Sequence, residues 1–344
     1  MINPKKIKKV WIIGVSTIGD MVINIPLFKL ARQTFPNAKI YFISWTYVGL
    51  KLIEKCPYID GIITESPSAN LWNKIKFIFR IFRERFDVTL TPRGFNLGFL
   101  VSIFSGARYR VWFVENRYSF NKTIPFGKLA SNIRVKYKYS RFLSDKRNNE
   151  YDCVKFIQEI LNPFRKDRRF IENLELFMDY KKEQDYMDTL LRKEKIATEE
   201  KVICVHLGWM KENRKRCRER EKRIQVFEFI IKNYNAKICF IGWEDNSAEV
   251  KAISHALWNN RQIIDFTKKL SLSQSTYLIS KCSLFLCTDS WPMHIAVWLN
   301  KRVIAILGPI THVIDKYIYC PIRKEKISDI TTEEVISAVK KSLW

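Results

Sequence analysis

Two short segments of this chain combine an apolar run, a polar turn and the start of a helical pattern. The first is Gly14-Val15-Ser16-Thr17-Ile18-Gly19-Asp20, and the second is Thr288-Asp289-Ser290-Trp291-Pro292-Met293-His294. Such a turn brings hydroxyl or carboxylate groups to a helix start, where backbone N–H groups and the positive end of the helix dipole attract anions. The first segment lacks a GxGxxG pattern and therefore only loosely resembles a dinucleotide-binding turn.

Asp20 has two interpretations, and the spacing alone leaves both open. As a helix N-cap, its carboxylate would accept hydrogen bonds from backbone N–H groups two or three residues further on. As a group at the edge of a cleft, it would accept a proton from a bound substrate. The two roles compete, because a carboxylate oxygen that caps a helix is less basic.

The second segment predicts an anion site suited to a diphosphate. Pro292 stands near the first helical position, which proline favours, and the N–H groups of the helix start are available to an anion. The Ser290 hydroxyl can donate a hydrogen bond. His294, one turn into the helix, either faces the same anion or is a buried or capping histidine.

Two basic stretches also leave a choice open. Residues 211–223 are rich in Lys and Arg, and they either form a solvated surface or supply one or two cations to the diphosphate. Residues 71–86 have helical spacing, with cations around an apolar stripe of Leu71, Ile75, Ile78, Phe79, Phe82 and Phe86. This helix either packs its stripe on the core or lies on an anionic membrane, where Trp72 and Phe77, off the stripe, would touch lipid.

The elements that must position these residues alternate along both halves of the chain. Short β-branched runs between longer helical patterns are typical of a parallel sheet covered by helices. The strands expected in the first half are Lys9–Gly14, Lys39–Ser44, Gly61–Thr64, Asp87–Thr91 and Tyr109–Phe113. Those expected in the second half are Val202–Leu207, Lys237–Gly242, Gln262–Phe266, Ser283–Thr288 and Arg302–Leu307. The expected helices include Val22–Thr34, Tyr47–Lys55, Leu71–Arg85 and a terminal helix over Thr331–Leu343.

The length of 344 residues is that of two domains. Clear periodicity is lost over residues 114–175, which predicts a boundary near residue 175 and domains of residues 1–175 and 176–344. We therefore expect two facing, doubly wound domains. Ligands of such sheets bind beyond the carboxyl ends of the strands, so the cleft between the domains is the expected site.

Composition excludes several protein classes. The chain has 60 Lys+Arg against 35 Asp+Glu, for a formal charge of +25, yet its 47% hydrophobic and 14% aromatic content is too high for a disordered polycation. The longest apolar stretch, around Phe95–Phe104, is about half of a membrane-spanning helix. The basic start and the short apolar run after it are interpreted as a mature cytoplasmic N-terminus.

Cysteine and histidine usage points away from disulfides and metals. The eight cysteines form no CxxC pair, so reduced and mostly buried thiols are expected. The four histidines show no metal-ligand spacing, and no metal or other cofactor is expected. The charge fits a polyanionic partner. A nucleic-acid-binding protein is a remaining alternative, but the cations are dispersed and no known nucleic-acid-binding motif is present.

Together these motifs resemble the ADP-heptose:lipopolysaccharide heptosyltransferases, glycosyltransferase family 9, over roughly residues 8–312. Ser16-Thr17-Ile18-Gly19-Asp20 with Pro26-Leu27 resembles the family's opening block, and residues 288–296 with Gly308-Pro309 resemble its donor-site block. The resemblance implies the GT-B architecture and inverting, metal-independent sugar transfer. Heptose from ADP-heptose would pass to a lipopolysaccharide-core or similar anionic, lipid-linked saccharide. The protein would be cytoplasmic, at the inner face of the membrane.

The resemblance also implies roles for residues. Asp20 would be the general base, and Lys215 would stabilise the leaving diphosphate. Donor binding would involve Gly208, Asp245, Leu270, Asp289, Ser290, Trp291, Met293 and His294. Acceptor binding would involve Ser16, Thr17, Gly19 and Arg93.

The chain departs from the family pattern at the donor block. Trp291 stands where the family has a glycine that lets the backbone approach the phosphates, and Cys217 stands where it has a tryptophan. An indole at this point would narrow or reshape the donor pocket. A relative that binds a nucleotide sugar without turning it over therefore stays as an alternative to an active transferase.

Overall fold

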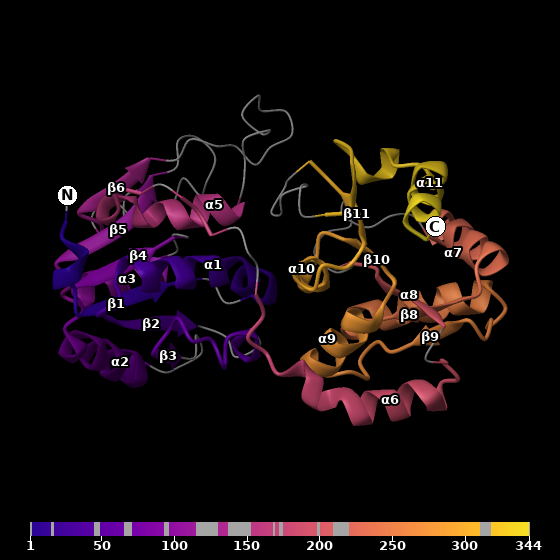
Figure 1. Cartoon of the computed structure of the whole chain (residues 1–344), viewed down its shortest axis with the longest axis horizontal. Coiled ribbons are helices and arrows are strands. Elements are labelled where there is room, and N and C mark those ends of the chain that lie inside the picture. The colour runs from indigo at the N-terminus through magenta and orange to yellow at the C-terminus, as the bar shows by residue number, and fades with distance from the viewer. Residues whose placement is uncertain are drawn as a thin grey trace. The chain divides into compact units, whose positions relative to one another are not determined.

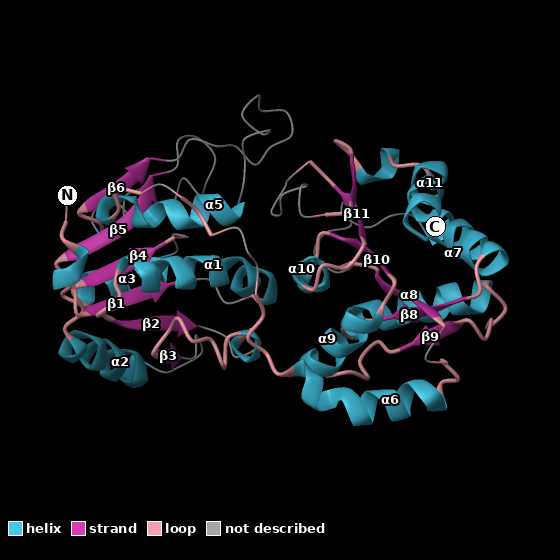
Figure 2. Ribbon diagram, in the orientation of Figure 1, coloured by secondary structure: helices cyan, strands magenta, loops and turns pink. Residues whose placement is uncertain are grey.

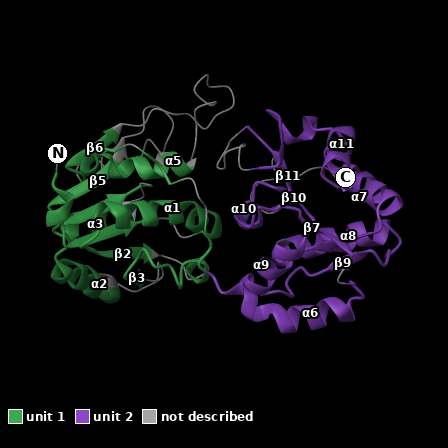
Figure 3. Ribbon diagram, in the orientation of Figure 1, with its two compact units in different colours: residues 1–139, 150–177 green, residues 140–149, 178–344 purple. Residues whose placement is uncertain are grey.

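The computed structural model describes residues 2–14, 17–44, 49–64, 71–92, 96–114, 130–136, 153–167, 169–171, 175–197, 200–208, 220–309 and 318–343. The chain divides into unit 1, residues 1–139 and 150–177, and unit 2, residues 140–149 and 178–344 (Figure 3). In each unit the strands form one sheet with helices beside it (Figure 2). The sheet, and not any single helix, is what brings the motifs of a unit together.

Unit 1 is a six-stranded parallel sheet in the order β3-β2-β1-β4-β5-β6 (Figure 1). Its strands are β1 (Lys9–Ile13), β2 (Lys39–Ser44), β3 (Gly61–Thr64), β4 (Val88–Thr91), β5 (Tyr109–Val114) and β6 (Ile133–Lys136). Its helices are α1 (Ile18–Thr34), α2 (Leu71–Glu84), α3 (Asn96–Phe104) and α5 (Cys153–Gln158), with 3₁₀ turns at Pro4–Lys6, Leu50–Leu52 and Glu159–Phe164.

The two faces of this sheet are covered by different helices. On one face, Trp11, Ile13 and Ile43 of the sheet form a buried cluster with Phe77 and Ile81 of α2 and with side chains near α3. On the other face, the Phe28 ring of α1 packs edge-on against Phe42, with ring centroids 5.1 Å apart. Strands buried on both faces explain why β4 is apolar or hydroxylated throughout.

Unit 2 repeats the scheme in the order β12-β11-β10-β7-β8-β9, again with parallel pairing throughout. Its strands are β7 (Lys201–His206), β8 (Ala236–Phe240), β9 (Ile263–Asp265), β10 (Leu284–Thr288), β11 (Val303–Leu307) and β12 (Cys320–Arg323). Its helices are α6 (Gln184–Lys193), α7 (Arg220–Asn233), α8 (Glu244–Ala256), α9 (Leu272–Lys281), α10 (Trp291–Trp298) and α11 (Thr332–Leu343), with 3₁₀ turns at Tyr180–Glu183 and Ile327–Asp329.

Both sheets have a point at which the strand order reverses. It lies between β1 and β4 in unit 1 and between β7 and β10 in unit 2. In a doubly wound sheet, ligands bind beyond the carboxyl ends of the two strands that flank this point. The structure therefore confirms the expected α/β class of two Rossmann-like units with a C-terminal helix, and it marks where a site in each unit belongs.

Two local expectations were wrong. The helix predicted over Tyr47–Lys55 is, in its described part, only the 3₁₀ turn Leu50–Leu52 between other turns. Neither alternative for the stripe of residues 71–86 holds throughout. Phe79 and Phe82, which the core alternative buries, are 65% and 61% exposed, although Phe86 of the same stripe is buried. Of the two residues that the membrane alternative places at lipid, Trp72 is exposed but Phe77 is buried at 6% exposure.

Among the described cysteines, those at positions 56, 204, 239, 282, 287 and 320 are free thiols, and all but Cys320 are buried. Burial raises the pKa of the Cys56 thiol to about 11, so this group stays protonated at neutral pH. The described ranges contain no group of three His, Cys, Asp or Glu side chains placed to hold a metal. They also contain no helix of the length and apolarity needed to cross a membrane.

Candidate active site

In unit 1, the candidate carboxylate Asp20 lies in the first turn of α1, directly after the central strand β1. The N-cap of this helix is Thr17, whose side-chain oxygen accepts a hydrogen bond from the Asp20 backbone N–H at 3.3 Å. The Thr17 hydroxyl in turn donates to Oδ2 of Asp20 at 2.7 Å. The interpretation of Asp20 as the N-cap was therefore wrong: Thr17 caps the helix and holds the Asp20 carboxylate.

The side chain of Asp20 is half-buried, and Gly19 beside it is buried. The second central strand of unit 1, β4, ends at Thr91, and Arg93 follows it two residues later. Ser16 and Arg93 lie outside the described residues, so their side chains add no geometry here. Asp20 and Arg93 nevertheless follow the two strands that flank the reversal of strand order in this sheet.

In unit 2, the chain passes unusually close to itself where β7 and β10 end. Gly208, two residues beyond β7, has φ +91°. A Cβ added to it would lie 2.3 Å from Oγ1 of Thr288, the last residue of β10. The Gly208 N–H donates to Nδ1 of the buried His206 at 3.2 Å, which fixes the turn after β7. Only glycine fits this position, for its backbone angle and for the contact.

The start of α10 lies at the same edge of the sheet. Ser290 is its N-cap, but the side chain makes no capping hydrogen bond. The Ser290 hydroxyl instead donates to the Thr288 carbonyl at 3.1 Å. By contrast, the neighbouring helix α9 is closed by a capping box between Ser271 and Gln274. An uncapped start exposes the positive end of α10, which suits an anion.

Trp291, the first residue of α10, lies among other aromatic rings. Its indole is 6.1 Å from the His206 ring and 5.9 Å from the Trp243 ring, centroid to centroid. These partners come from the end of β7 and from the turn after β8, so the indole lies at this edge of the sheet beside the start of α10. Met293 and His294 are buried, with His294 7% exposed, while Asp289 is half-buried.

The remaining predicted donor residues follow the strands next to β7. Asp245 lies in the first turn of α8 after β8, although its side chain lies outside the described part. Leu270 is half-buried between β9 and the start of α9. Lys215 and the rest of residues 209–219 also fall outside the described residues.

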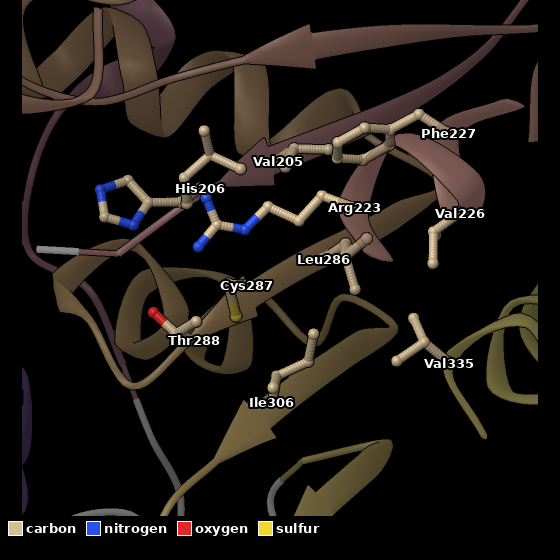
Figure 4. A pocket seen from close by; sticks show the side chains of 11 residues that line it. Val205, His206, Arg223, Val226, Phe227, Leu286, Cys287, Thr288, Ile306 and Val335 are labelled. Carbon is tan, nitrogen blue, oxygen red and sulfur yellow. The ribbon is translucent and has the colours of Figure 1, made fainter. Parts of the chain in front are cut away.

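Sequence reasoning missed two residues at this edge, Arg223 and His206. Arg223 of α7 is buried and donates to Oε1 of Glu249 at 2.9 Å, and Arg220 donates to Oε2 of the same carboxylate at 2.8 Å. Figure 4 shows Arg223 reaching from α7 toward His206, with Thr288 and Cys287 of β10 nearby. His206 was signalled by its place at the end of an apolar strand two residues before a glycine, but Arg223 was hidden within a charged run.

A cavity of about 30 Å³ lies among these side chains beneath the strand ends. This volume holds about one water molecule and is far below the several hundred Å³ of a ligand pocket. A ligand larger than a water molecule therefore does not fit within this part of the sheet edge. The cavity is too small to be a substrate-binding site.

Comparisons with known proteins agree with this arrangement. Residues 195–330 match the model of glycosyltransferase family 9 (heptosyltransferase). Lipooligosaccharide heptosyltransferase 2 of Haemophilus ducreyi is 22% identical over 314 residues, which cover 88% of this chain and 83% of that protein.

Two solved structures share the fold. A glycosyltransferase family 9 protein from Veillonella parvula has a TM-score of 0.75 at 15% identity, covering 98% of this chain and 97% of its own. The ADP-heptose lipopolysaccharide heptosyltransferase II of E. coli has a TM-score of 0.73 at 16% identity, with coverage of 97% and 98%. At this identity the likeness establishes the fold alone, which is that of the GT-B heptosyltransferases.

Proposed function

We propose that this chain, whose residues 195–330 match the model of glycosyltransferase family 9, moves heptose from ADP-heptose to a lipopolysaccharide-core or similar anionic saccharide. The transfer inverts the configuration at the sugar carbon and uses no metal. The observation that carries the proposal is the placement of the two motifs. In each unit, the residues able to do this chemistry follow the two strands that flank the reversal of strand order.

Unit 1 supplies the base and the acceptor site in this proposal. The Asp20 carboxylate takes the proton of the acceptor hydroxyl as that oxygen forms a bond to the anomeric carbon of the donor. Thr17 orients the carboxylate through its 2.7 Å hydrogen bond to Oδ2. Ser16, Gly19 and Arg93 complete the acceptor site, with Arg93 holding an anionic group of the acceptor.

Unit 2 binds the donor and receives the negative charge that the reaction releases. As the bond between the anomeric carbon and the diphosphate oxygen breaks, its electron pair stays on the departing ADP. The uncapped start of α10 and the cation of Lys215 stabilise that charge. The Ser290 hydroxyl, which donates to the Thr288 carbonyl in this structure, turns to the diphosphate when the donor is bound.

The other donor residues line the neighbouring strand ends. Gly208 keeps the turn after β7 close against Thr288, as its bare Cα and positive φ allow, and the backbone of this turn lies beside the diphosphate. Asp245 and Leu270 hold the nucleoside, whereas Asp289, Met293 and His294 support the turn and the helix that bear the phosphates. The reaction takes place in the cytoplasm, at the inner face of the membrane, where a lipid-linked acceptor is accessible.

Trp291 supports a second candidate, a relative that binds a nucleotide sugar but does not transfer it. Its indole, packed on His206 and Trp243, occupies the helix start at which the family pattern has glycine. ADP release from ADP-heptose, measured with and without saccharide acceptors, separates the two candidates. Acceptor-dependent release supports the transferase, and calorimetric donor binding without release supports the binding-only relative.

A further inference from the structure

Helix α2 carries apolar side chains on two opposite faces. Phe77 and Ile81, four residues apart, are buried against the sheet of unit 1. Trp72, Phe79 and Phe82 are 72%, 65% and 61% exposed, and their spacing of seven and three residues places them together on the other face. Phe77 and Ile81 supply the contacts of α2 with the core of unit 1, so the exposed stripe takes no part in that core.

The stripe continues onto the neighbouring helix α3, which packs beside α2. The Phe82 ring lies against the turn after α3, where a Cβ on Gly106 would be 3.4 Å from the ring. Leu100 and Phe104 of α3 are exposed as well. Nine large hydrophobic side chains are exposed in the described part of the chain, and these five gather on two adjacent helices. Gathering of this kind marks an interaction surface, whereas single exposed residues do not.

Cations border this surface, and the nearby acids are engaged elsewhere. Lys76, Arg80 and Arg83 are exposed along one flank of the stripe. The only acids between residues 71 and 109 are Glu84 and Asp87. The Glu84 carboxylate pairs with the Lys9 ammonium at 2.9 Å, and Asp87 accepts hydrogen bonds from the backbone N–H groups of residues 8 and 9.

We propose that the surface formed by Trp72, Phe79, Phe82, Leu100 and Phe104 docks the protein on a bilayer rich in anionic phospholipid. Aromatic side chains between cations suit the boundary between headgroups and acyl chains, where the rings bury their apolar area and the cations meet phosphates. A second copy of the chain suits this surface less well, because a symmetric contact would bring like cations together. The proposal does not depend on the reaction that the protein catalyses.

Sedimentation of the full chain with lipid vesicles tests the proposal. The chain is expected to bind vesicles that contain phosphatidylglycerol and to bind pure phosphatidylcholine vesicles weakly. The double variant Phe79→Ser/Phe82→Ser should lower vesicle binding by about tenfold or more, because both exposed rings are lost. Trp258→Ser is the matched control: Trp258 is 93% exposed in unit 2, and its loss should leave binding unchanged.

A second variant tests the cationic flank without touching the rings. Lys76→Glu/Arg80→Glu should abolish the preference for phosphatidylglycerol while far-UV circular dichroism stays that of the wild type. Wild-type binding to neither vesicle, or equal binding by the wild type and Phe79→Ser/Phe82→Ser, would overturn the proposal. It would also be overturned by a dimer in sedimentation velocity that the phenylalanine variant dissociates while vesicle binding is absent, since the surface would then be a self-interface.

Discussion

Gly208, which follows β7, lies so close to Thr288 at the end of β10 that residue 208 has no room for a side chain. A Cβ there would lie 2.3 Å from the Thr288 Oγ1, and φ of +91° strains any L residue. We predict that Gly208→Ala lowers the free energy of unfolding by about 1–3 kcal/mol and weakens ADP binding, because the turn must move. Urea unfolding and calorimetry measure the two effects.

The double variant Gly208→Ala/Thr288→Ala separates the contact from the backbone strain. Because Thr288→Ala removes the clashing hydroxyl, Gly208→Ala should lower the free energy of unfolding less in the Thr288→Ala background than in the wild type. Strict additivity of the two single changes would show that the contact does not limit residue 208.

Trp291 is the next test of the donor site. The Trp291→Gly variant restores the residue that the family pattern has at this position. Removing the indole from His206 and Trp243 should cost about 1–3 kcal/mol of folding free energy, and ADP should bind several-fold more tightly because the backbone becomes accessible. Weaker binding would mean that the indole contacts the donor, and unchanged binding would place it outside the site.

The Arg223–Glu249 ion pair is predicted to be structural. Both side chains are buried, at 7% and 9% exposure, so Glu249→Gln leaves a buried guanidinium without its counter-charge and should cost about 3–5 kcal/mol of unfolding free energy. Glu244→Gln is the control: it breaks an ion pair with Lys268 whose side chains are 80% and 43% exposed. That change should cost at most about 1 kcal/mol. Equal losses in the two variants would contradict the burial argument.

The Glu175 carboxylate accepts hydrogen bonds from the Lys29 ammonium at 2.5 Å and from the Tyr58 hydroxyl at 3.1 Å, and this cluster predicts a pH dependence of stability. The hydrogen bond from Lys29 holds the pKa of Glu175 below its ordinary value of 4.5, and the same bond raises the pKa of Lys29 above 10.5. The contribution of Glu175 is therefore present above pH 4.5 and is lost as pH falls through its lowered pKa. That of Lys29 is present below pH 10.5 and is lost as pH rises through its raised pKa.

Urea midpoints of the wild type and Glu175→Gln test this linkage. The side chains of Lys29 and Glu175 are 25% and 30% exposed, so the two proteins should differ in free energy of unfolding by about 0.5–1 kcal/mol at pH 7. It should shrink as the pH falls below 4.5. A difference that persists unchanged in acid would mean that the carboxylate charge is not its source.

Much of the fold could be predicted from the sequence, because a parallel strand buried on both faces is a continuous apolar run. Strand β10, Leu284–Thr288, was found with only its first residue misplaced. Strands β6, which contains Arg134 and Lys136, and β12, which contains Pro321 and Arg323, were missed because neither is a continuous apolar run. Pro321 in β12 argues against a strand in the interior of a sheet but is tolerated at its edge.

Other features required the tertiary structure. The apolar residues of α2 extend from its buried side to its exposed side, so periodicity could not decide whether Phe77 or Phe79 faces the core. Sequence reasoning considered only Asp20 as the N-cap of α1, and the geometry showed that Thr17 has this role, although a hydroxyl three residues before an acid was a usable signal. Trp291 could be recognised as a departure, but its packing on Trp243 could not be predicted from its place in the chain.

The central claim is that Asp20 is the base for a donor held by unit 2, and one comparison tests it most directly. ADP release from ADP-heptose with a saccharide acceptor is measured for the wild type and Asp20→Asn, alongside calorimetric donor binding. The account predicts that the asparagine variant binds the donor as the wild type does, while its turnover falls by about 10²–10⁴-fold. Equal turnover of the two proteins would contradict it.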